Sequence, residues 1–340
     1  MITKYIFFPY YLALRLRHAL YDKGVKKSRK FPVPVYCVGN IAVGGTGKTP
    51  MTEYLCTLLE KQGRVAVLSR GYKRRSRGFR LVETGSPAEE VGDEPLQIKL
   101  RFPGITVAVD GDRSRGISTL LAMEPAPECI VLDDAFQHRA VVPSKSIVMM
   151  DYSRPLYSDE LLPVGRLRDI PSRIRKADAV VVSKCPTFVD DWERSEIRSR
   201  LRLAPSQKLF FACIKYLPFR PLFKECGDVR YTYSKQVFLI SGIADPRPLE
   251  VYLCGWFDTI THEVFPDHHN FTAKDIRTIT RFAEENPTVL LLTTEKDGAR
   301  LFGDSRIPDA IKPRLFYIPI EMEFLTENEA AEFAEFTALS

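Results

Sequence analysis

A glycine-rich segment that ends in Lys48 and Thr49 holds residue types suited to binding phosphate. It reads VGNIAVGGTGKTP over residues 38–50. Backbone N–H groups of such a loop, and the positive end of the helix that follows, point at bound phosphates. We expect Lys48 to reach the β- and γ-phosphates and the Thr49 hydroxyl to hold Mg²⁺. The predicted nucleotide contacts are Gly44, Gly45, Thr46, Gly47, Lys48 and Thr49.

One position of this loop departs from the usual G-x-x-x-x-G-K-[ST] pattern, because Ala42 stands where the first glycine is expected. The flanking sequence nevertheless fits a nucleotide loop. An apolar stretch over 33–38 predicts a strand before it, and 51–61 predicts a helix after it. This strand–loop–helix context favours a nucleotide site over a glycine-rich turn that contains GKT by chance.

A pair of acidic residues, Asp133 and Asp134, follows the apolar stretch 130–132. A carboxylate at the end of a strand beside a phosphate loop is typical of Mg²⁺ binding in nucleotide enzymes. Adjacent acids point to different faces, so at most one of them is expected to ligate the metal directly. The alternative is a pair of solvated aspartates in a turn.

Two further predicted strands end in charged residues. The stretch 105–109 leads into Asp110 and Asp112, and an Asp at this edge could orient or deprotonate an attacking hydroxyl. The stretch 65–69 leads into a basic cluster that either holds an anionic substrate or is a solvated loop. Its cations are Arg70, Lys73, Arg74 and Arg75.

The run Asp267-His268-His269 holds two of the five histidines of the chain. It suggests metal binding or acid/base chemistry, or else a polar turn that caps the next helix through Asn270 or Thr272. The guanine-reading pattern N-K-x-D is missing, since 183–186 reads SKCP. ATP is therefore the favoured nucleotide.

The order of the predicted elements indicates an α/β fold with a doubly wound parallel sheet and a second, smaller α/β domain. We predict a P-loop core domain over 31–208, a linker over 209–235 and a C-terminal domain over 236–340. Strands of the core are predicted at 33–38, 65–69, 105–109, 129–132, 146–150 and 179–182. In the second block, strands are predicted at 209–214, 237–240, 259–264, 289–293 and 315–320, and a helix at 272–285.

Residues 1–30 combine aromatic and apolar side chains with many cations. The apolar run is too short to span a bilayer, and no small-residue cleavage site follows it. It fits an interfacial membrane helix, the alternative being a helix that packs on the chain's own core. Seven dispersed cysteines indicate reduced thiols and no zinc site. The net charge of +6 is weak support for a nucleic-acid partner, and we expect none.

In combination, these motifs resemble the tetraacyldisaccharide 4′-kinase family of lipid A biosynthesis. The resemblance runs in the family's order from residue 38 to residue 297, and Ala42 is typical of this family's loop. Besides the phosphate loop, the matching segments are SRGYKRR, VGDEP, DGDRSRG, LDDAFQHR, LLPVGRLRD, ADAVVVSK, SGIADP, FPDHHNF and TTEKD.

The resemblance implies transfer of the ATP γ-phosphate to the 4′-hydroxyl of a tetraacyldisaccharide 1-phosphate at the inner-membrane surface. It assigns the catalytic aspartate to Asp112, oriented by His268 across a cleft that closes, and the Mg²⁺ carboxylates to Asp133 and Asp134. Asp169 stands where the family usually has Glu, so a place near the metal is in doubt for it. The basic cluster becomes a candidate site for the acceptor. We expect a monomer on the cytoplasmic face of the inner membrane. The alternatives are a P-loop GTPase-type metal or assembly chaperone and a nucleotide-gated membrane-binding module.

Overall fold

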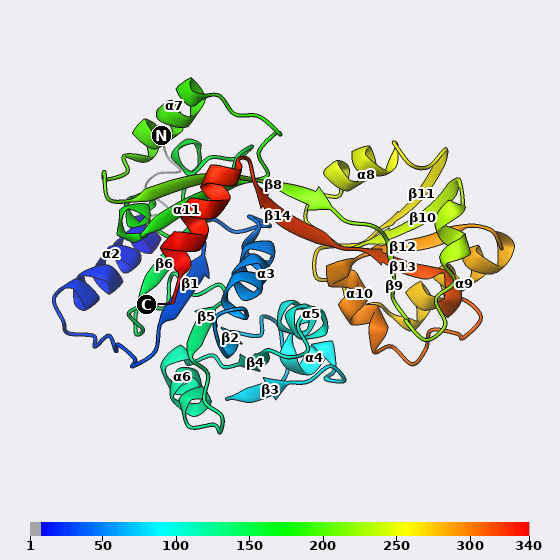
Figure 1. Cartoon of the computed structure of the whole chain (residues 1–340), viewed down its shortest axis with the longest axis horizontal. Coiled ribbons are helices and arrows are strands. Elements are labelled where there is room, and N and C mark those ends of the chain that lie inside the picture. Colours follow the sequence, from blue (N-terminus) through cyan, green and yellow to red (C-terminus); the bar gives the residue numbers. More distant parts are fainter. Residues whose placement is uncertain (1–7, 340) are drawn as a thin grey trace.

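The computed structural model describes residues 8–339. Its elements form two α/β units, each built on its own sheet and lying side by side along the longest axis (Figure 1). We call the elements around the nine-stranded sheet the first domain and those around the five-stranded sheet the second domain. The mixed α/β fold with a large parallel sheet agrees with the prediction.

The nine-stranded sheet has seven parallel inner strands and an antiparallel strand at each edge. Strand β1 lies between β5 and β6, so the chain winds outward from it in both directions, which is the arrangement that places a ligand at the carboxyl ends of the central strands. In spatial order the strands are β14 (Ile320–Phe324), β8 (Lys208–Tyr216), β7 (Ala179–Ser183), β6 (Lys145–Asp151), β1 (Val35–Gly39), β5 (Cys129–Leu132), β2 (Val65–Ser69), β4 (Thr106–Val109) and β3 (Arg80–Val82).

Both faces of this sheet are covered, which explains why its strands read as continuous apolar runs. One face packs against α3 (Lys48–Leu59), α5 (Asp93–Arg101) and α11 (Glu327–Thr337). The other face packs against α6 (Arg113–Leu121) and α7 (Asp191–Leu201). The shorter helices are α4 (Ala88–Val91), η1 (Leu156–Ser158), η2 (Pro171–Lys176), η3 (Val229–Tyr233) and η4 (Lys312–Arg314).

The second domain has four parallel strands and the short antiparallel β9. Their order is β11 (Thr259–Val264), β10 (Gln236–Ser241), β12 (Leu290–Thr294), β13 (Leu315–Ile318) and β9 (Arg220–Pro221). Its helices are α8 (Arg247–Leu253), α9 (Ala273–Glu285) and α10 (Glu295–Phe302). Helix α9 starts at a capping box formed by Thr272 and Asp275, close to the predicted start.

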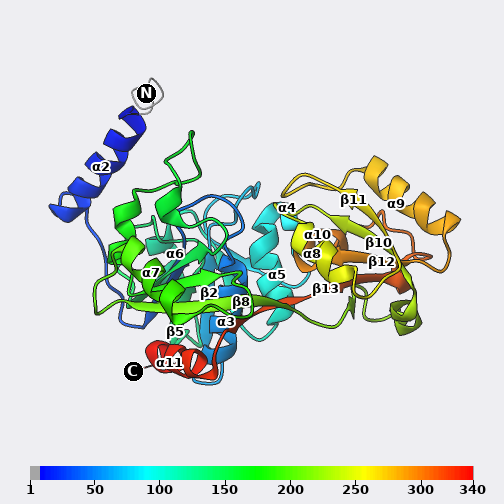
Figure 2. The ribbon, with the colours of Figure 1, turned by 90° about the horizontal axis from the view of Figure 1, so that it is seen from above.

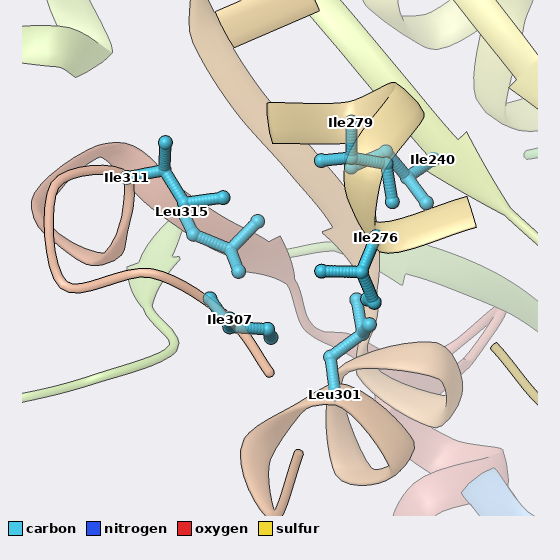
Figure 3. A pocket seen from close by; sticks show the side chains of 7 residues that line it. All are labelled: Ile240, Ile276, Ile279, Leu301, Ile307, Ile311 and Leu315. Carbon is cyan, nitrogen blue, oxygen red and sulfur yellow. The ribbon is translucent and has the colours of Figure 1, made fainter. Parts of the chain in front are cut away.

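Figure 3 shows a gap in the core of this domain, ringed by Ile and Leu side chains only. Its volume of about 10 Å³ is that of a single water at most. The gap is a packing defect and offers no polar group to a ligand. The lining residues are Ile240, Ile276, Ile279, Leu301, Ile307, Ile311 and Leu315.

Two parts of the predicted domain division differ from the structure. Residues 209–216, predicted as linker, continue β8 of the first sheet, and 320–337, predicted in the C-terminal domain, return to the first domain as β14 and α11. The crossing is visible in Figure 1, where β8 and β14 run together between the two sheets. The local sequence of β14 does not indicate which sheet it joins, because its partner β8 lies about 100 residues earlier in the chain.

Helix α2 (Phe8–Asp22) begins the described chain, and residues 1–7 of the predicted interfacial segment lie outside it. One face of α2 docks on the first domain, with Leu14 and His18 buried. Leu12 and Leu16 on the other face are 53% and 60% exposed. Among the described residues, no helix is both long enough and apolar enough to cross a bilayer.

Candidate active site

The phosphate loop connects β1 to α3 at the centre of the first sheet. Gly47 has a φ of 78°, and a Cβ there would lie 3.3 Å from both Ser183 Oγ and Met322 Cε, so glycine is required on both grounds. Inside the loop, Asn40 Nδ2 donates a hydrogen bond to Thr46 Oγ1 at 2.6 Å. Helix α3 then starts at Lys48 and directs its N-terminus at the loop.

The two acidic residues after β5 have different surroundings. Asp133 is 1% exposed and accepts hydrogen bonds from Thr52 Oγ1 at 3.2 Å and Ser69 Oγ at 3.4 Å. Asp134 accepts a bidentate pair of hydrogen bonds from the Arg168 guanidinium, one at each carboxylate oxygen. Its Oδ1 atom lies 4.0 Å from Lys48 Nζ. Asp134 is therefore neutralised by cations, whereas Asp133 has only hydroxyl partners.

Burial raises the pKa of Asp133 to about 7, and the nearby Glu94 and Asp134 charges add to the shift. A buried carboxylate of this kind favours a cation beside it. Carboxylate and hydroxyl oxygens are the ligands that Mg²⁺ prefers, with the remainder coming from water and nucleotide phosphates. Asp133 together with Thr49 therefore fits a Mg²⁺ site, although no group of three or more metal-ligating side chains occurs within residues 8–339.

A second cluster joins the two domains. Asp93, the first residue of α5, lies 2.9 Å through Oδ2 from Nδ1 of His268 in the second domain. The other ring nitrogen of His268 lies 3.1 Å from Lys296 Nζ, and the His268 ring meets the Tyr72 ring edge-on. Arg300 of α10 also pairs with Oδ2 of Asp93.

The position of Asp93 follows from the close approach of two glycines. Gly92 has a φ of 92°, and a Cβ on it would lie 3.1 Å from the Cα of Gly71, just after β2. This contact brings the start of α5 to the carboxyl edge of the sheet, near Asp133. The next residue, Glu94, is close enough for its charge to raise the pKa of Asp133, so the ionisable pair and the phosphate loop belong to the same edge of the sheet.

The electrostatics of the cluster keep Asp93 ionised. Burial alone would raise the pKa of Asp93, but the hydrogen bond from His268 and the charges of Arg300 and Lys296 outweigh it. The net result is a pKa well below the ordinary value for Asp. The site thus combines a phosphate loop, an acidic metal position and an ionised carboxylate held by a histidine.

Comparison with known proteins agrees with this geometry. Residues 5–336 match the family described as tetraacyldisaccharide-1-P 4′-kinase. The chain belongs to this family. A tetraacyldisaccharide 4′-kinase of Phocaeicola vulgatus is 42% identical over 321 residues, covering 92% of this chain and 88% of that protein. One of Flavobacterium johnsoniae is 41% identical, covering 96% of this chain and 95% of that protein.

A solved structure is also similar over nearly the whole chain. It is that of LpxK from Aquifex aeolicus, described as a complex with ATP, with a TM-score of 0.72 and 31% sequence identity. The match covers 97% of this chain and 96% of that one. The family resemblance predicted from the sequence is therefore confirmed.

The predicted pairing of His268 with Asp112 differs from the structure, in which His268 contacts Asp93. Asp112 is exposed and caps α6, accepting hydrogen bonds from the backbone N–H groups of Ser114 and Arg115 at 3.0 and 3.2 Å. No hydrogen bond or ion pair between residues 8 and 339 joins Asp112 to His268. An Asp beside Arg in a strand-end motif serves as an N-cap as readily as a base, and the sequence does not distinguish the two.

The four cations of the predicted acceptor cluster divide into two groups. Arg74 donates to the carbonyl oxygen of Gly78 within its own loop, and Arg75 pairs with Glu89 at 2.8 Å. Arg70 and Lys73 are exposed, and neither forms an ion pair within the described chain. Arg70 and Lys73 are thus the members available to an anionic ligand.

Sequence reasoning missed the roles of Asp93 and Arg168, although both lie in segments that carry the resemblance. Arg168 holds Asp134 and also donates to Asn40 Oδ1 at 2.5 Å, which connects the 161–169 segment to the phosphate loop. Asp169, whose place near the metal was in doubt, is 1% exposed and accepts a hydrogen bond from His18 Nε2 at 2.6 Å. It therefore anchors α2.

Proposed function

We propose that this chain is an ATP-dependent kinase that phosphorylates the 4′-hydroxyl of a tetraacyldisaccharide 1-phosphate in lipid A biosynthesis. The observation that carries the proposal is the Asp93–His268 pair at the start of α5, on the same sheet edge as the phosphate loop, in a member of the 4′-kinase family. The family match does not favour the GTPase-type chaperone or the nucleotide-gated membrane module.

In this proposal, ATP lies along the loop 44–49, with Lys48 at its β- and γ-phosphates. Thr49 and Asp133 would hold Mg²⁺, which would neutralise phosphate charge when bound. Asp134 orients Lys48 while Arg168 fixes Asp134 in place. These groups stabilise the charge that develops during transfer, which is the main task of a phosphoryl-transfer enzyme.

The acceptor hydroxyl would be oriented by Asp93. His268 and Arg300 both contact Oδ2, which leaves Oδ1 of Asp93 to accept the hydroxyl proton. Phosphoryl transfer passes through a loose transition state, so the carboxylate needs chiefly to orient the hydroxyl and take its proton late. His268 and Arg300 act as positioning residues. Because His268 comes from the second domain, separation of the domains would admit the acceptor and their contact would assemble the site.

The acceptor is a lipid, and we propose that α2 places the enzyme on the cytoplasmic face of the inner membrane as a monomer. Leu12 and Leu16 are exposed beside Arg15, the pattern of a helix that lies in the headgroup region. Changing Leu12 and Leu16 to Gln should reduce sedimentation with vesicles, whereas Val251→Ala, an exposed position on α8, should not. Equal binding of both variants would contradict this role for α2.

A kinase assay tests the proposed reaction. Purified protein with Mg²⁺ should transfer phosphate from ATP, and less from GTP, to the acylated disaccharide 1-phosphate. The deacylated disaccharide should be a poorer acceptor. Lys48→Ala should reduce turnover by at least ~10²-fold from lost charge stabilisation, while Lys61→Ala, just after α3, should not. ATP hydrolysis without phosphate on the sugar would refute the kinase assignment.

A further inference from the structure

A cleft of about 570 Å³ lies between α2 and η2, apart from the phosphate loop and the Asp93 cluster. Its floor and walls come from one face of α2 and from the segment after Asp169. The charged and titratable residues that line it are Arg15, His18, Asp22, Arg173, Arg175 and Lys176. It is much larger than the apolar gap in the second domain and has a polar lining.

The charge of this cleft is strongly one-sided. Among residues 8–339, none of the four cations Arg15, Arg173, Arg175 and Lys176 forms an ion pair. The single carboxylate in the lining, Asp22, already binds Arg139 at 2.6 Å. The ring of His18 is held by Asp169. Arg15 also donates a hydrogen bond to the neutral Tyr11 hydroxyl at 3.0 Å, which leaves its charge uncompensated. The four cations can therefore attract an anion from outside the chain.

Arg173 is the most confined of these cations. Its Nε atom is buried and has no hydrogen-bond partner in the described structure. Burial lowers the pKa of Arg173, and the nearby Arg139 charge lowers it further. The Asp169 and Asp22 charges act in the opposite direction, but Nε of Arg173 still has no acceptor, and an anion with several oxygens would accept this N–H.

The location of the cleft indicates what kind of anion reaches it. Arg15 lies on α2 between Leu12 and Leu16, which are exposed. When these leucines enter the acyl region of a membrane, the cations beside them lie at the level of the lipid phosphates. Free phosphate carries a similar charge, but membrane insertion of the leucines does not bring it to these cations.

We propose that the cleft between α2 and η2 binds the phosphate of an anionic membrane phospholipid, such as phosphatidylglycerol. This site differs from the proposed acceptor site and does not depend on phosphate transfer. Because His18 in the cleft bonds Asp169, next to Arg168, a bound headgroup would also hold α2 against the loop that supports Asp134.

The test compares two variants of equal charge on the full chain. The first changes Arg173, Arg175 and Lys176 to Gln. The control changes Lys274, Arg277 and Arg281 of α9 to Gln, three exposed cations at the opposite end of the molecule (Figure 2). Sedimentation is measured with phosphatidylcholine vesicles with and without phosphatidylglycerol. A third variant, Arg175→Gln with Lys176→Gln, alters only exposed side chains in case the Arg173 change affects folding.

Each well-placed cation contributes roughly fivefold to binding of an anionic membrane. The cleft triple variant should therefore bind phosphatidylglycerol vesicles at least tenfold more weakly, and the double variant several-fold more weakly. The α9 control should change less than twofold, and binding to pure phosphatidylcholine should not change. Inorganic phosphate at millimolar concentration should compete poorly with the vesicles.

Three results would overturn the proposal. Equal losses in the cleft and α9 variants would show attraction by net charge alone. Full displacement from vesicles by millimolar phosphate would identify a free-anion site. Unchanged vesicle binding with a raised KM for the detergent-dispersed disaccharide 1-phosphate would assign the cleft to the acceptor's own phosphate. Loss of kinase activity itself has no bearing here, because vesicle binding is measured without substrate.

Discussion

The ring of His268 in the second domain hydrogen-bonds the carboxylate of Asp93 in the first, with 2.9 Å between Nδ1 and Oδ2. This contact unites two segments separated by 175 residues of chain. Arg300 strengthens it by binding the same oxygen. The Asp93 carboxylate is therefore held by residues of the other domain, and in the proposed mechanism catalysis depends on how the domains meet.

Replacing Asp93 should affect catalysis far more than replacing Asp112. Asp93→Asn removes the proton acceptor with little change in volume, and we expect turnover to fall by about 10²–10⁴-fold. Asp112→Asn keeps an N-cap on α6 and should retain most of the turnover. Initial rates with saturating ATP and acceptor measure both. A larger loss in Asp112→Asn than in Asp93→Asn would return the base to Asp112, as the family resemblance implied.

Acid should weaken the contact between the domains. The pKa of Asp93 is lower in the folded protein than its ordinary value near 3.8, so its ionised form stabilises the fold. This contribution is complete above the ordinary value and is lost as the pH falls through the folded pKa. The difference in free energy of unfolding between wild type and Asp93→Asn should thus be constant above about pH 5 and shrink below about pH 4.

Urea unfolding at several pH values measures this difference. Asp309→Asn is a suitable control, because Asp309 is an exposed carboxylate whose only ion pair in the described chain is with Lys312. The free energy of unfolding of Asp309→Asn should stay close to that of the wild type at each pH. A difference for Asp93→Asn that grows toward low pH would contradict the sign derived from the lowered pKa.

The His18–Asp169 pair should connect α2 energetically to the site. Both side chains are buried, and Nε2 of His18 lies 2.6 Å from Oδ1 of Asp169. His18→Ala and Asp169→Ala should each cost about 1–3 kcal/mol, because each leaves a buried polar partner. In a double-mutant cycle, the coupling energy should exceed about 1 kcal/mol. Additive effects, or losses near zero, would show that α2 docks without this contact.

Much of the fold and part of the site could be predicted from local sequence. Continuous apolar stretches gave the central strands, because parallel strands covered on both faces exclude polar residues. The phosphate loop and the Asp133–Asp134 pair carry their chemistry within a few residues, so their motif suffices to find them.

What the sequence could not predict depends on contacts between distant segments. Asp93 lies in a helix start that resembles any acidic first turn, and only the packing of Gly92 on Gly71 brings that helix start to the carboxyl end of β2. The sequence does not distinguish Arg168 from the other arginines, and only the fold shows that it binds Asp134. The sequence likewise did not show that His268 contacts Asp93 and not Asp112, because that contact forms only where the two domains meet.

The return of the chain's end to the first domain can be tested at Phe333. This side chain of α11 is fully buried, with its ring 5.3 Å from that of Phe210 on β8 and 4.8 Å from that of Phe324 on β14. Phe333→Ala should reduce the free energy of unfolding by about 3–5 kcal/mol through the cavity it leaves. Phe188→Ala, at a side chain that is 76% exposed, should change it by less than about 0.5 kcal/mol.

Hydrogen exchange then identifies which domain loses stability. If residues 320–337 belong to the first domain, Phe333→Ala should speed exchange of the backbone amides of β1, β7 and β8 and leave β10 and β12 protected. The alternative division, in which everything after residue 236 folds with the second sheet, predicts the reverse. Faster exchange confined to β10 and β12 would thus contradict the packing of α11 against the first sheet, where the Phe333 ring lies in the same core as α3.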